Sequence, residues 1–192
     1  MKRFALILFS FLLINFTAAN ENGIAVENLL LQQNGAVFYL NADLNIQWNE
    51  PLTKNLEHGI PIFFVADTQI YKPRWWWADK KIAAAQKKWA ISYHPMTREY
   101  RLESDTVQFF RDFESLAAAL SRIRGWEIVG AEKLENGEKY TLMFRFALDY
   151  EALPKTFQLG IWGNREWALD SGWIFQKNLA LTVENFEKAG EK

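Results

Sequence analysis

The sequence predicts a mainly β protein, an antiparallel β-sandwich with one amphipathic helix at about 112–124 and a short helical turn at about 52–58. Residues 35–48 and 140–150 alternate apolar and polar side chains with period two, which is the pattern of strands that bury one face. Turn residues separate several further apolar runs, and a single stripe at helical spacing interrupts the series. Many antiparallel strands of this kind pack as two sheets around a shared core.

Residues 1–19 are expected to be a signal peptide. Lys2 and Arg3 precede an apolar region that is shorter than the roughly 20 residues of a membrane span. Residues 17–19 supply the small side chains that a signal peptidase requires, so we expect cleavage after Ala19 and a periplasmic protein. The alternative is an uncleaved N-terminal anchor. No later segment is long and apolar enough to span a bilayer, so no transmembrane segment is expected after cleavage.

The strand candidates follow one another along the chain between turn signals. Their ranges are 24–31, 35–48, 60–71, 88–93, 99–103, 126–131, 140–150, 156–162 and 173–183. Turns are predicted at Gly59-Ile60-Pro61, His94-Pro95, Leu153-Pro154 and Asp170-Ser171-Gly172. The pair Asn136-Gly137 predicts a hairpin turn before 140–150, because both residues tolerate positive φ.

The helix at 112–124 begins after an N-cap, Asp112, and Gly125 follows it as the C′ residue. Its apolar stripe consists of Phe113, Leu116, Leu120 and Ile123, and Arg122 and Arg124 stand where the helix dipole favours cations. Gly59 ends the shorter turn at 52–58. Residues 79–86 stay open between a helix, favoured by their Ala and Lys content, and a hairpin arm, favoured by their place between two strands.

No internal linker or repeat is found, so we expect one β-sandwich domain from 20 to 186 and a charged, frayed tail at 187–192. The chain has no cysteine, which excludes a disulfide framework, a thiol nucleophile and a lipoprotein anchor. About 170 residues are enough to build a stabilising core without disulfides. The mature chain has 20 basic and 23 acidic residues after Lys2 and Arg3 are removed, and this balance gives no reason to expect nucleic-acid binding.

Motifs of catalysis and metal binding are missing from the sequence. His58 and His94, the only histidines, stand beside turn residues, and no cofactor or metal is expected. A glycosidase needs a pair of carboxylates, for which Asp43 and Asp149 are the residues to inspect, since each lies on the polar side of a strong strand. The alternative is that both are solvated strand residues.

The most unusual segment is Lys72-Pro73-Arg74-Trp75-Trp76-Trp77-Ala78-Asp79. If it is extended, Trp75 and Trp77 share one face, and Arg74 and Trp76 share the other and can stack. One interpretation places Trp75 and Trp77 in the core, with Trp76 packed beneath Arg74. The other makes Arg74 and Trp76 a binding platform for a ligand or partner.

A second aromatic cluster spans 164–173. There, Trp167 and Trp173 flank a tight turn, and Arg165 has acidic neighbours. Arg165 and Trp167 are therefore further candidates for partner binding, with a structural role as the alternative.

These clusters, together with three intervening motifs, resemble the DUF4390 family of exported proteobacterial proteins of unknown function. The resemblance covers nearly the whole mature chain and rests on Pro73-Arg74-Trp75-x-Trp77-x-Asp79, Ser92-Tyr93-x-x-x-Thr97-Arg98-x-Tyr100-Arg101-Leu102, Leu120-Ser121-Arg122-Ile123-Arg124-x-Trp126, Leu153-Pro154-Lys155-x-Phe157-Gln158 and Arg165-x-Trp167-x-Leu169. It implies that such proteins are encoded near a membrane sensor kinase, which would suit a periplasmic partner role. It brings no catalytic or ligand-binding residues.

The expected function is a non-enzymatic binding or accessory module for an envelope protein partner. The alternative is a domain that binds or hydrolyses glycans such as peptidoglycan in an aromatic-lined groove.

Overall fold

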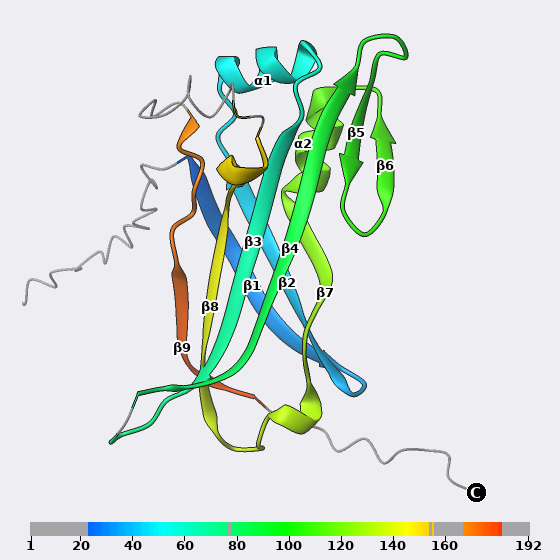
Figure 1. Ribbon diagram of the computed structural model, residues 1–192. Helices are drawn as coiled ribbons and strands as arrows, with labels where there is room; N and C mark the ends of the chain where they lie inside the picture. Colours follow the sequence, from blue (N-terminus) through cyan, green and yellow to red (C-terminus); the bar gives the residue numbers. More distant parts are fainter. Residues whose placement is uncertain (1–22, 77, 154, 156–166, 182–192) are drawn as a thin grey trace, which may run out of the picture.

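The computed structural model describes residues 23–76, 78–153, 155 and 167–181. Its elements, in chain order, are β1 (Ile24–Asn34), β2 (Val37–Ile46), α1 (Glu50–Glu57), β3 (Ile62–Lys72), β4 (Lys80–His94), β5 (Glu99–Glu103), β6 (Val107–Phe110), α2 (Phe113–Leu120), β7 (Arg122–Gly130), η1 (Ala131–Lys133), β8 (Lys139–Leu148), η2 (Tyr150–Ala152) and β9 (Ile174–Ala180). The predicted fold class, mainly β with antiparallel sheets and two helices, is confirmed (Figure 1).

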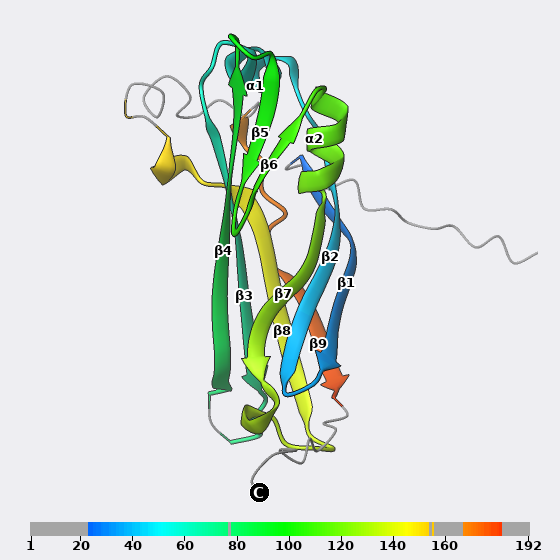
Figure 2. The same ribbon diagram turned by 90° about the vertical axis from the view of Figure 1, so that its right-hand side faces the viewer.

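Two antiparallel sheets lie face to face (Figure 2). One has three strands in the order β1-β2-β7, and the other has six in the order β6-β5-β4-β3-β8-β9. Their inner faces share one core, in which the Phe64 and Phe146 rings stack 5.4 Å apart and Trp89 meets Phe146 edge-on at 5.5 Å. A hydrogen bond also links the two sheets: the Gln176 side chain of β9 donates to the Leu29 carbonyl of β1 at 3.0 Å.

The longest strand pair is the β3–β4 hairpin. Its pairing runs from Ile62 and Ile91 near the helices to Lys72 and Lys80 at the far end, with one register shift after Ile70. Residues 80–94 form one strand, which decides between the two alternatives for 79–86. The ladder to β3 satisfies the backbone groups of this segment, so its helical propensity does not prevail. The end of the hairpin bends away from the other strands as an arm (Figure 1).

The predicted helix at 112–124 is shorter in the structure. Asp112 is the N-cap, as expected, and accepts a hydrogen bond from the Ser115 amide at 2.7 Å, but the helix ends at Leu120. The next residues, up to Gly130, form β7 and pair with β2. Gly125 has the expected positive φ of 59°, but it lies within β7, so its assignment as the C′ residue of the helix was wrong. Pairing with β2 decides where the helix stops.

The short helical turn predicted at 52–58 is α1. Asn49 caps it by accepting from the Leu52 amide at 3.0 Å, and Gly59 follows with φ of 81°.

The Asn136-Gly137 turn is present, with φ of 81° at Gly137, but it is not a hairpin turn. β7 and β8 belong to different sheets, so this connection crosses between them. The sequence analysis also missed β6, whose Val107, Gln108 and Phe109 are all exposed and therefore show no alternation. The strand predicted at 156–162 lies outside the described residues.

Candidate functional site

Residues 73–79 join β3 to β4 and are called the tip loop. Pro73 begins it, directly after the last residue of β3, because proline has no amide hydrogen for a strand ladder. A carboxylate oxygen of Asp79 accepts a hydrogen bond from the Arg74 amide at 3.2 Å, which ties the two ends of the loop together. This hydrogen bond therefore closes the loop next to the last residue pair of the β3–β4 hairpin, Lys72 and Lys80.

Trp75 and Trp76 of the tip loop face solvent. Trp75 is 93% exposed and Trp76 is 66% exposed, and their rings lie 6.3 Å apart at 64°. The interpretation that placed Trp75 in the core was wrong, because it assumed an extended strand in which neighbouring side chains alternate between faces. The segment is instead a loop beyond the sheet, and Trp77 lies outside the described residues.

Arg74 is exposed beside these rings. The predicted stacking of Arg74 on Trp76 is not found among the described contacts, where Trp76 instead meets Trp75 edge to face. The stacking argument also depended on an extended backbone, which the loop does not have.

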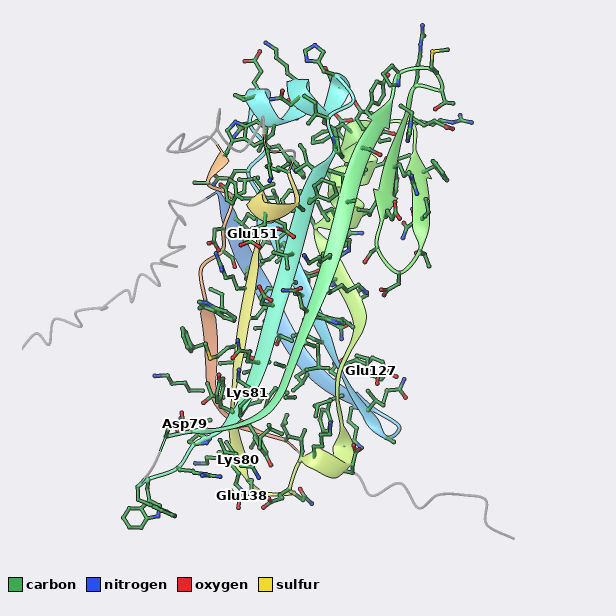
Figure 3. All side chains as sticks on the ribbon, in the orientation of Figure 1. Asp79, Lys80, Lys81, Glu127, Glu138 and Glu151 are labelled. Carbon is green, nitrogen blue, oxygen red and sulfur yellow. The ribbon has the colours of Figure 1, made fainter. Side chains whose placement is uncertain are left out.

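Lys80 and Lys81 lie at the base of the tip loop, where Asp79 and Glu138 also lie (Figure 3). Lys80 and Lys81 are exposed at the start of β4, and the Lys81 ammonium lies 5.6 Å from the centre of the Tyr71 ring. Lys72 differs, because it forms ion pairs with Glu135 at 2.8 Å and with Glu138 at 3.5 Å. Its hydrogen bond with Glu135 raises the pKa of Lys72 and lowers that of Glu135.

The second sequence-predicted cluster does not form an exposed surface with the first. Trp167 is 4% exposed, so its side chain is a core residue and is not available as a contact residue. Its carbonyl accepts hydrogen bonds from the Tyr150 hydroxyl and from the Leu169 amide. Arg165 lies outside the described residues. Asp170 pairs with Arg145 of β8 through two parallel hydrogen bonds of 2.9 and 2.5 Å.

Asp43 lies on β2 of the three-stranded sheet and Asp149 follows β8 of the six-stranded sheet, and each forms its own ion pair. Asp43 of β2 pairs with Arg124, whose hydrogen bond lowers the pKa of Asp43, whereas a general acid needs a raised pKa. Asp149 is buried after β8 and accepts from Lys88 at 2.9 Å. Neither arrangement is that of a glycosidase acid.

Two further features are absent from the described parts of the chain. No group of three or more His, Cys, Asp or Glu side chains there is placed to hold a metal ion. None of the helices described there is long and apolar enough to cross a bilayer.

The sequence analysis missed two components of the tip loop's surroundings. One interpretation assigned Trp75 to the core, and Lys80 and Lys81 were not named as candidate residues. Pro73 and Asp79 were the signals that could have identified a loop, since proline ends a strand and a short acidic side chain closes turns.

A sequence-family model described as "Domain of unknown function (DUF4390)" matches residues 21–176. The chain belongs to the DUF4390 family. In this DUF4390 protein the matched range covers β1 to β8, including the tip loop, and ends within β9. A search of the curated proteins and a search of the solved structures each gave no match.

Proposed function

We propose that this DUF4390 protein is exported to the periplasm and acts there as a non-enzymatic accessory module for an envelope protein. The observation that carries the proposal is the tip loop, which presents Trp75, 93% exposed, and Trp76, 66% exposed, at the end of a paired arm. Exposing two indoles to water is unfavourable, and tryptophan and arginine are preferred at the centres of protein interfaces. Arg74 in the same loop adds to this preference.

Export is supported by the N-terminal sequence. Lys2 and Arg3, the apolar region and the small residues before Asn20 are those of a signal peptide. Because the family resemblance implies a neighbouring membrane sensor kinase, such a kinase is the first partner to test. A partner of this kind would lie beside the membrane, within reach of an exported protein.

The geometry of the tip loop favours a protein partner over the alternative of a glycan. Sugar rings stack on flat aromatic surfaces, whereas the planes of Trp75 and Trp76 meet at 64°. The ion pairs of Asp43 and Asp149 support a binding role rather than hydrolysis. A change in tryptophan fluorescence on titration with peptidoglycan fragments would favour the glycan instead.

The proposal can be tested by cross-linking in intact cells. The chain has no cysteine, so Ala78→Cys gives one unique thiol in the tip loop for a photoactivatable cross-linker. We expect it to capture a specific envelope protein, and the protein purified from the periplasm to begin at Asn20. Gln108→Cys on exposed β6 is the matched control and should capture no such partner.

The double variant Arg74→Ala/Trp76→Ala, made in the Ala78→Cys background, should abolish capture while its circular dichroism spectrum stays unchanged. Capture that survives this variant, or that is equal from Gln108→Cys, would contradict the proposal. Unfolding of the variant would instead show that the two side chains stabilise the fold.

A further inference from the structure

The charge of the arm's end is opposite in sign to that of the whole chain. Residues 72–81 contain four basic residues and one acidic residue, which gives +3, and Glu135 and Glu138, which pair with Lys72, reduce this local charge to +1, whereas the full chain carries −1. The three exposed cations in this range are Arg74, Lys80 and Lys81. The arm therefore brings a local positive charge and two exposed indoles to one place.

The acidic side chains near the tip loop are already engaged. Glu135 and Glu138 pair with Lys72, and Asp79 accepts from the Arg74 amide. Arg74, Lys80 and Lys81 form none of the described ion pairs, although the charge of Lys80 is close enough to Glu135 to help lower the pKa of that carboxyl. An anionic surface that approached the arm would meet Arg74, Lys80 and Lys81 first.

Tryptophan exposed beside lysine and arginine is typical of protein segments that lie at the interface between lipid and water. Indole rings settle at the level of the lipid headgroups, where the apolar body leaves water and the N–H stays hydrogen-bonded. Basic side chains near that boundary are attracted to anionic lipids. Lipids in a bilayer move laterally and can adapt to the shape of a bound loop. A bilayer can therefore accommodate two rings whose planes meet at 64°.

We propose that the tip loop docks on the surface of an anionic phospholipid bilayer. Trp75 and Trp76 enter the headgroup layer, and Arg74, Lys80 and Lys81 contact lipid phosphates. This inference rests on the proposed function, in which the tip loop is the contact surface of the module, and it names the lipid surface as part of what that loop contacts.

The shape of the hairpin supports this assignment. The β3–β4 ladder continues to Lys72 and Lys80, directly beneath the loop, so the rings are held at the end of a paired arm. The arm points away from α1, α2 and the β5–β6 hairpin, which lie at the opposite end of the molecule (Figure 1). Docking of the tip loop would therefore leave that opposite end free.

The test is co-sedimentation of the purified exported protein with vesicles, one set of phosphatidylethanolamine and phosphatidylglycerol and one of phosphatidylcholine alone. We expect binding to the anionic vesicles, weakened by added salt, together with a blue shift of tryptophan emission. Trp75→Ala/Trp76→Ala should weaken binding by about tenfold or more, because two indoles no longer leave water.

The triple variant Arg74→Ala/Lys80→Ala/Lys81→Ala should weaken binding to anionic vesicles by about 100-fold, or about fivefold for each charge. Matched controls lie at the opposite end of the molecule. Phe109→Ala removes an aromatic side chain that is 61% exposed, and Arg111→Ala removes an exposed cation. Both variants should bind as the unsubstituted protein does, because both substitutions lie at the end of the molecule opposite the tip loop.

Three results would overturn the inference: no binding of the folded protein to anionic vesicles, equal binding to phosphatidylcholine, or binding that the tryptophan variant leaves unchanged. Its failure differs from failure of the proposed function. A cross-linked protein partner without vesicle binding removes the lipid docking alone. Vesicle binding without any captured partner removes the accessory role and keeps the docking.

Discussion

Phe146 of β8 makes two aromatic contacts within the six-stranded sheet. It is fully buried, stacks on Phe64 of β3 and receives the edge of Trp89 from β4, so it joins three neighbouring strands through side chains. In a chain without disulfides, packing of this kind has to supply most of the stability.

We expect Phe146→Ala to lower the free energy of unfolding by about 3–5 kcal/mol, because it removes a large buried ring and leaves a cavity. Phe109→Ala, at a ring that is 61% exposed, should change it by no more than about 0.5 kcal/mol. Urea unfolding followed by circular dichroism measures both. Equal losses in the two variants would contradict the role assigned to Phe146.

At the same scale, the sequence predicted some side-chain environments and not others. The alternating residues of 35–48 and 140–150 revealed which faces are buried, because a strand's period of two separates them. In the tip loop the same period was applied to Trp75 and Trp77, although Pro73 had already ended the strand. The burial of Trp167 depends on segments distant in the sequence, including Tyr150, so the local sequence does not reveal it. Trp167 was therefore considered a contact residue.

At the level of elements, β7 contains a bulge against β2. The register shifts between Leu40 and Ala42, and Gly125 at the shift has φ of 59°. The Asn41 side chain accepts from the Gly125 amide at 2.9 Å, so the backbone group that leaves the ladder is still bonded. Arg124 donates to the Ala42 carbonyl at 2.8 Å on the same bulge.

Replacing Gly125 by alanine should destabilise the protein by about 1–2 kcal/mol, since a side chain with a Cβ rarely adopts positive φ. An added Cβ would meet nothing within 4 Å, so the cost comes from the backbone alone. Gly125→Asn should cost less, because asparagine tolerates this conformation. Thermal unfolding monitored by circular dichroism compares the two, and an alanine variant as stable as the parent would refute the argument.

The ends of elements were predicted less well than the elements themselves. Residues 122–125 are compatible with a helix end, and only the partner strand β2 makes them a strand. The sequence also did not predict which strands pair with each other. The Asn136-Gly137 turn has the same sequence signal whether it joins two paired strands or crosses between two sheets. β6 had no signal to find, because none of its first three residues is buried.

For the molecule as a whole, several carboxylates are more acidic in the folded protein than usual. The pKa values of Asp43, Glu50, Asp112 and Glu135 are lowered by hydrogen bonds from Arg124, Lys54, the Ser115 backbone and Lys72, respectively. A lowered pKa means that the unfolded chain takes up protons first on acidification. The stability from these groups is therefore present above their usual values of 3.8 and 4.5 and is lost as the pH falls through the lower, folded values.

We accordingly expect the urea midpoint to stay level near neutral pH and to fall below about pH 4.5. Asp112→Asn keeps an acceptor for the Ser115 amide but has no proton to gain, so the acid-induced loss should become shallower in this variant. Urea titrations over a pH series give both curves. A midpoint that rises on acidification, or an Asp112→Asn curve parallel to that of the parent, would exclude this account.

The place of β3 also determines how the molecule responds to mechanical force. β3 lies between β4 and β8, and its ladder to β8 runs from Phe64 to Tyr71. A pull on the tip loop acts along β3, and the hydrogen bonds of antiparallel strands stand perpendicular to that direction. Such a pull loads all the bonds of the ladder together in shear instead of unzipping them one after another. A pull along β3 from its tip-loop end would therefore be resisted by the whole β3–β8 ladder at once.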